Sequence, residues 1–373
     1  MDLDDLRARR MAAHRLSGPA PDVVAAAQHM TATQAQEFWG GRWALAIRAA
    51  GEPTLSEVDA AFERGELIRS WTQRGTVHIV DPRDLEWMLS ITSDRQNRQA
   101  AGIHRSLDID DDPLARAEHA ARAALRGGNR LTRPEFAAIL AGAGVDTAGM
   151  RGNMILTALC RRAVMVLGPV VPREDAPTRE QYLVAADEWI TGAVTPADPL
   201  AEMLVRYLRG HGPATLADFR WWAGLPLRLA RAAREGAGGR VAEVDDGVLV
   251  EADAEAQAGA EPGADAGAPR PDVGERPLGA DPLALPPFDE YYLSYADRTV
   301  AAPEDLVRVI GPSANGAVKP VLIDSGGSVV GTWKHSLAVG RHHLAPVADL
   351  PDPGADPASV TAALARFSRF LAA

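Results

Sequence analysis

Helix-start signals recur along the chain and set the first expectation for its fold. Segments beginning at Thr54, Thr132 and Thr215 each contain threonine, two residues, an acid and an apolar residue, and they lie 78 and 83 residues apart. The hydroxyl of such a threonine accepts the backbone N–H of the fourth residue, while the acid favours the positive end of the helix dipole. The pattern therefore predicts three helix N-termini of capping-box type.

A strand signal follows each predicted helix start. Apolar runs occupy 67–71 with 76–80, then 164–167, then 241–250 around an Asp-Gly turn, and the first and last of these are typical of hairpins. Helix, helix and hairpin in this order predict three tandem winged-helix units. In the first unit only one helix separates the cap from the hairpin, so its partner helices are expected upstream, near 22–30 and 33–49.

The predicted fold class is α+β, mainly α, with an additional C-terminal β-hairpin. Residues 251–281 are rich in Ala, Gly, Pro and acids, which is typical of a disordered linker. Beyond them, 319–324 and 328–333 predict a hairpin, and 357–371 has the apolar spacing of a final helix. The expected parts are the first winged-helix unit with a Gln-Ala-Gln motif at 1–105, the second at 106–195, the third at 196–250, the acidic linker at 251–282, and the hairpin region with the final helix at 283–373.

Composition places the chain among ordinary globular proteins. Its 373 residues are 46% hydrophobic and 24% charged, enough for two or three domains with full cores. Cys160 is the single cysteine, which excludes an intramolecular disulfide and a cysteine-rich zinc site and fits a reducing cytoplasm. The charged N-terminus lacks a signal-peptide core, and no stretch approaches the roughly 18 apolar residues of a membrane helix. A soluble cytoplasmic protein without a membrane partner is expected.

The net charge of −11 argues, at face value, against a nucleic-acid partner. Residues 243–281, however, hold eleven acids and two bases, so this stretch carries −9 and the remainder only −2. Of the 39 basic residues, 37 are arginines, and the two lysines are Lys319 and Lys334. GC-rich coding is the simpler explanation of this bias, although arginine also suits bidentate phosphate contacts.

Several chemistries have no motif here. The chain contains no G-x-S-x-G, H-E-x-x-H or G-x-G-x-x-G pattern, and the run 311–319 lacks the Gly-Lys-Ser/Thr ending of a phosphate loop. His342 and His343 are adjacent and would point apart on a strand, so solvated histidines are favoured over a shared metal. The acids at 108–112 are best explained by capping of a helix near Pro113. No metal and no cofactor are predicted.

Four segments, at 33–36, 72–80, 212–225 and 285–298, together resemble the bacterial AlkZ-like (YcaQ-like) DNA glycosylases, over about residues 20–335. The resemblance implies three winged helices arranged as a C-shaped cradle for duplex DNA, with a β-hairpin near the damaged base. It also implies hydrolysis of the N-glycosidic bond of alkylated bases, N7-alkylguanine included, with some members unhooking interstrand crosslinks. The family's catalytic motif, glutamine, an apolar residue, then glutamine or aspartate, corresponds here to Gln34, Ala35 and Gln36.

Two carboxamides fit one kind of leaving group. A carboxamide has no useful basicity, so Gln34 and Gln36 can orient a water molecule but cannot deprotonate it. An N7- or N3-alkylated purine already carries positive charge and departs as a neutral base, so the amides can suffice and an undamaged base should not be cleaved. Thr33-x-x-Gln36 is also a capping-box pattern, and residues two apart diverge on a helix. If both amides meet one substrate, they must sit at a helix start or in an irregular turn.

Other candidates follow from position. Arg74 in the turn of the first hairpin and His78 on its second strand are candidates for contact with the DNA backbone, or else ordinary turn residues. Lys334 and His335 end a hairpin strand that the resemblance places near the lesion. Arg298 is a further DNA-binding candidate, with a role in the junction after the linker as its alternative. Asp289 in the same segment is expected to help build that junction, with ordering of the active-site water as its alternative. Of the adjacent Trp221 and Trp222, one is expected in the core and the other over a seam.

The sequence therefore predicts a metal-free, monofunctional DNA glycosylase, monomeric and cytoplasmic (nucleoid-associated), acting on double-stranded DNA with alkylated bases. A bifunctional enzyme needs an amine nucleophile, for which Lys334 is the plausible candidate. The main alternative is a non-catalytic winged-helix DNA-binding protein or transcriptional regulator, because a fold alone does not set function. A protein-interaction scaffold is a third possibility, and it suits the net charge.

Overall fold

A computed structural model describes residues 1–252, 282–314, 316–350 and 356–372. The chain forms two compact units. Unit 1 contains Met1–Val58, Asp175–Pro177 and Leu200–Ala373, and unit 2 contains Asp59–Glu174 and Thr178–Pro199. The predicted linker falls, from 253 to 281, outside the described residues, and the five-part division of the chain stays a prediction. No helix within the described ranges is long and apolar enough to cross a membrane.

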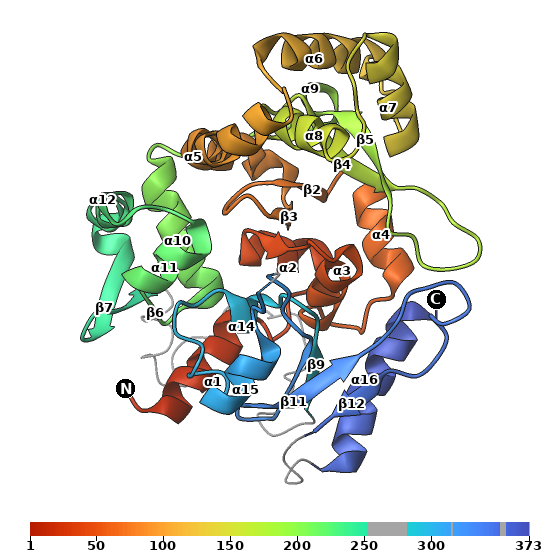
Figure 1. The fold of residues 1–373 in the computed structure, drawn as a ribbon. Helices are drawn as coiled ribbons and strands as arrows, with labels where there is room; N and C mark the ends of the chain where they lie inside the picture. The colour runs from red at the N-terminus through yellow and green to blue at the C-terminus, as the bar shows by residue number, and fades with distance from the viewer. Residues whose placement is uncertain (253–281, 315, 351–355, 373) are drawn as a thin grey trace, which may run out of the picture. The chain divides into compact units, whose positions relative to one another are not determined.

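Unit 2 is built around an antiparallel sheet whose strands follow the order β3-β2-β4-β5 (Figure 1). A contiguous apolar core packs helices α6 and α8 and the sheet together, with residues such as Leu125, Leu159 and Leu183 almost inaccessible to solvent. Its strands are β2 (Ile68–Trp71), β3 (Val77–Val80), β4 (Met165–Val170) and β5 (Gln181–Ala185), and its helices are η1 (Pro82–Asp84), α5 (Leu85–Ser106), α6 (Asp111–Leu125), α7 (Arg133–Gly142), α8 (Arg151–Arg161) and α9 (Ala186–Trp189). Helix α4 (Leu55–Glu63) contains the boundary between the two units.

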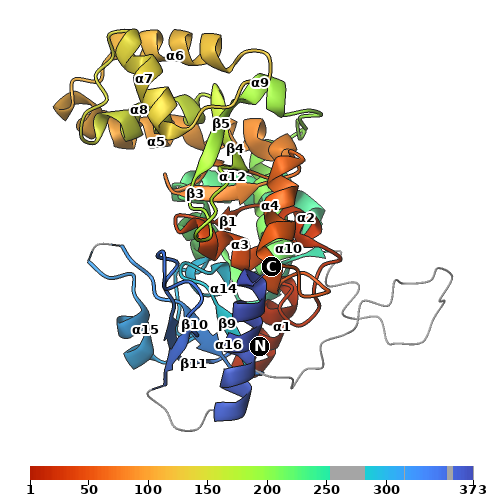
Figure 2. The same ribbon diagram turned by 90° about the vertical axis from the view of Figure 1, so that its right-hand side faces the viewer.

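Unit 1 contains two antiparallel sheets, ordered β6-β8-β7 and β12-β11-β10-β9. Its strands are β1 (Thr33–Gln34), β6 (Ala214–Thr215), β7 (Val241–Asp245), β8 (Val248–Glu251), β9 (Leu283–Leu285), β10 (Val321–Ile323), β11 (Val329–Lys334) and β12 (Val347–Asp349). Its helices are α1 (Leu3–Ala13), α2 (Val23–Met30), α3 (Phe38–Ile47), α10 (Pro199–His211), α11 (Leu216–Ala223), α12 (Leu227–Ala237), η2 (Gly238–Arg240), α14 (Glu290–Leu293), α15 (Glu304–Ile310) and α16 (Pro357–Leu371). Figure 2 shows α16 alongside the sheet that contains β9 and β10.

All three predicted helix starts are confirmed as reciprocal caps. The backbone N–H groups of Glu57, Glu135 and Asp218 donate to the threonine hydroxyls at 3.3, 3.4 and 3.2 Å, and the acids accept the threonine backbone N–H groups in return. The hairpins formed by β2 with β3, β7 with β8 and β10 with β11 are confirmed, as is the final helix. Local signals thus fix these elements.

One predicted element is wrong at its start. The helix expected from residue 33 begins at Phe38, with Glu37 at its N-cap position, and Thr33 and Gln34 form the short strand β1 instead. The Thr33 hydroxyl has no hydrogen-bond partner among the described residues, so the capping box suggested by Thr33-x-x-Gln36 does not form. The glutamine motif therefore lies before the helix, from the end of β1 into the connection with α3.

Helix α3, which follows the motif, is anchored on both sides by unit 1. Trp43 donates its indole N–H to the carbonyl of Ala284 at 2.6 Å, and its ring meets that of Phe367 from α16 at 5.3 Å between centroids. Gly40 lets the 286–287 segment approach the helix, because a Cβ at this position would lie 3.3 Å from the Pro287 ring. The start of α3, and with it the glutamine motif, is thus held by segments from the far end of the chain.

Candidate active site

The two glutamines occupy different environments in one irregular turn. Gln34 on β1 is only 4% exposed, whereas Gln36 is exposed to solvent. The Gln34 side chain folds back along the chain, and its Oε1 accepts the backbone N–H of Gln36 at 3.1 Å. This arrangement matches the expectation that the two amides sit outside regular helix. The buried Gln34 side chain fixes the backbone of the turn, and Gln36 is exposed to solvent.

A buried carboxylate is hydrogen-bonded to the backbone of this turn. Glu290 at the start of α14 is 1% exposed, and its Oε1 accepts the backbone N–H of Gln34 at 2.8 Å. Its Oε2 accepts from the indole N–H of Trp222 at 3.2 Å and from the hydroxyl of Ser294. Since a buried carboxylate is stable only when its oxygens are satisfied, these donors explain how Glu290 is accommodated. One side chain thereby joins β1, α11 and α14.

Two buried histidines lie in the same network. His211 at the end of α10 donates from Nδ1 to the carbonyl of Tyr207 at 3.1 Å, and its Nε2 lies 3.7 Å from Oε2 of Glu290. His14 of α1 packs edge-on against His211, with ring centroids 4.9 Å apart. Burial lowers the pKa of His14 well below its ordinary value, so this ring is neutral at pH 7. It bonds through Nε2 to the hydroxyl of Tyr295 at 2.8 Å, and that hydroxyl donates to the carbonyl of His211 at 2.6 Å.

Asp289, next to Glu290, is held by an arginine. Arg48 forms a bidentate ion pair with it, Nη1 to Oδ2 at 2.9 Å and Nη2 to Oδ1 at 2.7 Å, and both side chains are about 1% exposed. Asp289 also accepts the backbone N–H of Tyr291 at 2.9 Å. Both carboxylate oxygens are therefore used to fix the junction between α3 and α14, which is a structural role.

Arg298 lies on aromatic surfaces of the same unit. Its guanidinium carbon is 4.7 Å from the ring centroid of Trp221 and 5.8 Å from that of Tyr292. Trp221 is 38% exposed and donates its indole N–H to the carbonyl of Leu293, while Trp222 is fully buried. The expectation that one of the two tryptophans lies in the core is confirmed for Trp222. Burial lowers the pKa of Arg298, yet the cation–π contacts stabilise its charge.

Arg74 and His78 belong to unit 2, where Arg74 lies in the turn between β2 and β3 and His78 lies on β3. Arg74 is half-buried and adopts a positive φ of 55°. His78 is fully buried, with Nδ1 2.9 Å from the hydroxyl of Thr72 and Nε2 3.4 Å from that of Thr76. This geometry makes His78 an organiser of the turn. Contact of either residue with DNA stays a prediction.

Lys334 and His335 line a cavity of about 610 Å³ in unit 1. Burial lowers the pKa of His335, whose ring packs edge-on against Phe367 at 5.0 Å. Of the residues that line this cavity, sequence reasoning indicated Lys334 and His335 and missed the others, Lys319 and Trp39 among them, although Trp39 follows Gln36 by three positions. The full lining is Trp39, Lys319, Pro320, Thr332, Trp333, Lys334, His335, Val347, Ala348 and Asp349.

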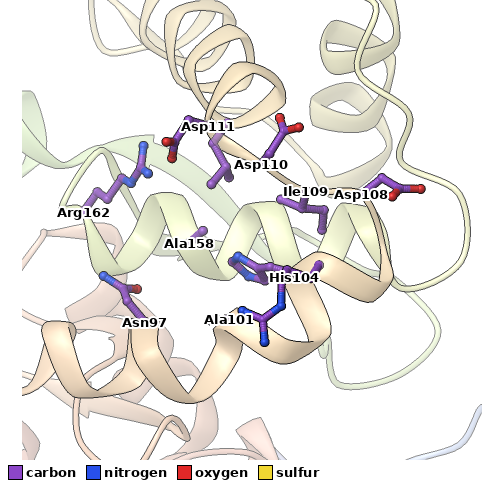
Figure 3. A pocket seen from close by; sticks show the side chains of 11 residues that line it. Asn97, Ala101, His104, Asp108, Ile109, Asp110, Asp111, Ala158 and Arg162 are labelled. Atoms are coloured by element: carbon purple, nitrogen blue, oxygen red, sulfur yellow. The ribbon is translucent and has the colours of Figure 1, made fainter.

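Unit 2 has a separate pocket of about 460 Å³, between the end of α5 and the start of α6. Figure 3 shows basic and acidic side chains, among them Arg162 and Asp111, around the same opening. Asp110 caps α6 by accepting the backbone N–H of Asp112 at 3.2 Å, as the sequence predicted. Throughout the described parts of the chain, no group of three or more His, Cys, Asp or Glu side chains could hold a metal ion.

Comparisons with known proteins identify the class to which this fold and site belong. A family model for AlkZ-like DNA glycosylases matches residues 27–370. A curated relative, an interstrand DNA cross-link repair glycosylase of Streptomyces sahachiroi, is 26% identical over 339 residues, which cover 86% of this chain and 83% of the relative. The solved structure of Streptomyces sahachiroi DNA glycosylase AlkZ shares the fold, with a TM-score of 0.76 and 20% identity over 99% of this chain and 97% of that one.

These matches define the class as DNA glycosylases, enzymes that act on DNA. The chain belongs to the AlkZ-like DNA glycosylase family. The resemblance seen in the four sequence segments is thereby confirmed, and membership of an enzyme family favours a glycosylase over a non-catalytic DNA-binding protein.

Proposed function

We propose that this glycosylase hydrolyses the N-glycosidic bond of N7- or N3-alkylated purines in duplex DNA, including bulky adducts or interstrand crosslinks. The observation that carries the proposal is the Gln34–Gln36 turn, in which one amide is buried and fixed while its neighbour is exposed beside it. The name of the curated relative supports crosslinks as part of the substrate range.

The chemistry assigned to the turn is the positioning of water. Gln34 is held through its backbone N–H by Glu290, and its Oε1 fixes the backbone of Gln36. The Gln36 carbonyl can accept a hydrogen bond from a water molecule and aim that water at the anomeric carbon of the sugar. Because an alkylated purine leaves as a neutral base, the barrier lies in holding this water against an oxocarbenium-like sugar. Neither amide has to remove a proton before the bond breaks.

The proposal includes a monofunctional mechanism, in which water and not an amine attacks the sugar. No metal is assigned a step, since the positive charge on the alkylated base already activates it as a leaving group. Arg74, Arg298, Lys334 and His335 are proposed to contact the DNA, and the buried His78 is proposed to support that contact through the turn that it organises. The three winged-helix units and their cradle for a duplex, a monomeric state and association with the nucleoid complete the proposal.

The test is base release from a duplex carrying one N7-alkylguanine, measured as alkali-labile abasic sites. We expect Gln36→Ala to lower single-turnover base release about 100-fold or more, as loss of a positioning group does, with duplex binding retained. Gln34→Ala should lower it as well, because the turn loses its internal hydrogen bond. Gln99→Ala, an exposed glutamine of α5, is the matched control and should release the base at the wild-type rate.

Two outcomes would contradict the proposal. Unchanged base release by folded Gln36→Ala and Gln34→Ala proteins would remove the two amides from the mechanism. No base release by the wild-type protein, with duplex binding intact, would favour the alternative of a DNA-binding protein that does not remove the damaged base.

A further inference from the structure

The two lysines of this chain lie together in the fold. Arginine supplies 37 of the 39 basic residues, and the remaining two, Lys319 and Lys334, line the same cavity of unit 1. They are 15 positions apart in the sequence. Lysine differs from arginine in carrying a compact point charge on a flexible stem, with three donors that can follow a moving acceptor.

The register of β10 and β11, continued past the start of β10, sets the two lysines at facing positions. In the antiparallel pair of β10 and β11, Val321 lies opposite Thr332, and the backbone N–H of Trp333 donates to the carbonyl of Pro320 at 3.2 Å. Continuing this register by one more position sets Lys319 opposite Lys334. Facing residues on antiparallel strands have Cβ atoms about 4.5–5.5 Å apart, and like charges at such positions destabilise the pair.

The surroundings of the pair leave the repulsion largely unbalanced. Both lysines are exposed, and within the described residues no carboxylate oxygen forms an ion pair with either ammonium group. Asp349 of β12 lines the cavity too, so the charged residues around it sum to one net positive charge. An anion between the two ammonium groups would convert the repulsion into attraction.

The cavity is linked to the glutamine motif through Trp39. This residue, in the first turn of α3, lines the cavity with its ring centroid 5.9 Å from that of Trp333, and Gln36 stands three residues before it in the chain. A group bound by the lysines is therefore near the place where Gln36 is proposed to hold water. In DNA, the anion closest to a glycosidic bond is the phosphodiester of the same or the neighbouring nucleotide.

We infer that Lys319 and Lys334 together bind one phosphodiester of duplex DNA and so set the position of the strand relative to Gln36. The inference rests on the proposed function for the identity of the ligand. It adds Lys319 and the pairing of the two lysines, which no motif indicated. It also explains why two like charges face each other at the end of a hairpin. Their repulsion destabilises the free protein, and a bound phosphate relieves that repulsion.

The experiment measures binding to an undamaged duplex as a function of salt concentration, so its result does not depend on base release. Each phosphate contact contributes about 0.9 to the slope of log affinity against log salt. Lys319→Gln and Lys334→Gln should each weaken binding roughly 3- to 10-fold at 0.1 M salt and leave the slope nearly unchanged, because the remaining lysine still neutralises the phosphate. The double variant removes the phosphate contact and should lower the slope by about 0.9.

Two controls separate this site from net charge and from simple structural damage. The double variant with Lys319→Arg and Lys334→Arg keeps both charges and should retain affinity and slope. Arg308→Gln removes an exposed charge on α15, outside the cavity, and should leave the slope unchanged. In the absence of DNA, either lysine-to-glutamine change should raise the melting temperature by roughly 1–2 °C through relief of the repulsion.

Three results would overturn the inference. Wild-type affinity and slope in the double glutamine variant would show that the lysines do not touch the duplex. A lowered melting temperature in both single glutamine variants would show that the pair has a structural role. Inorganic phosphate that stabilises the wild-type protein but not the double variant, with duplex binding equal in the two, would assign the site to a free phosphate ion.

Discussion

Replacing Glu290 by alanine removes the acceptor that three buried groups share. The backbone N–H of Gln34, the indole N–H of Trp222 and the hydroxyl of Ser294 all donate to this carboxylate. A buried donor left without a partner costs about 1–3 kcal/mol, so the three together lose roughly 3–9 kcal/mol. Since a typical domain is stable by only about 5–15 kcal/mol, Glu290→Ala should leave unit 1 largely unfolded or severely weakened.

Glu290→Gln is the sharper perturbation because it keeps the shape of the side chain. The amide oxygen can still accept from Gln34, and the amide nitrogen can donate to the hydroxyl oxygen of Ser294. The indole N–H of Trp222 is then left facing a donor, so one orphaned group remains and the expected loss is about 1–3 kcal/mol. The folded fraction should retain much of its base release, because the hydrogen bond to Gln34 survives.

Denaturant unfolding of the two variants measures these losses, with base release followed under conditions where each protein is folded. Glu235→Ala, which removes an exposed carboxylate from α12, is the control and should change stability by less than about 0.5 kcal/mol. The reasoning is refuted if Glu290→Ala unfolds within about 1 kcal/mol of the wild type, since three orphaned donors could not then be present.

Two further predictions concern buried titratable groups. Burial lowers the pKa of His29 to about 4, whereas a histidine in the unfolded chain has a pKa near 6.5. Between these two pH values, His29 is protonated in the unfolded chain and neutral in the folded protein. Stability should fall as the pH drops from about 6.5 towards 4, by roughly 3 kcal/mol from this residue, and a flatter pH dependence of unfolding in His29→Gln would support this. Burial raises the pKa of the Cys160 thiol to about 12, so a thiol reagent at pH 8 should label the protein only after unfolding, and rapid native labelling would argue against it.

Sequence reasoning succeeded where the determinants of structure are local. The caps at Thr54, Thr132 and Thr215 need only a hydroxyl and an acid three residues later, and the hairpins need a turn between strand-forming residues. Thr33 matched the same capping pattern, but it does not cap a helix, because the conformation of its turn is set by hydrogen bonds with residues distant in the sequence. Gln34 bonds to Glu290, 256 positions away, and Gln36 bonds to the Gln34 side chain in place of a helix cap.

The candidate active site could also be predicted only where its determinants are local in the sequence. The resemblance in the motif pointed to Gln34 and Gln36, and the structure places them together in one turn. The spacing of residues did not indicate that Glu290 bonds to the backbone of Gln34, because the two residues are 256 positions apart in the sequence. Lys319 and Lys334 could be paired only once the register of β10 and β11 was known, although the scarcity of lysine in the chain was visible from the beginning.

The hydrogen bond between Gln34 and Glu290 also sets when the glutamine turn can become ordered during synthesis. The ribosome makes the carboxylate that fixes this turn about 250 residues after the glutamine motif. Helix α16, which packs on α3 through Phe367, is completed only at residue 371. The nascent chain therefore carries the two glutamines of the motif without the support that orders them, and a prematurely terminated product would have the motif without its ordered turn.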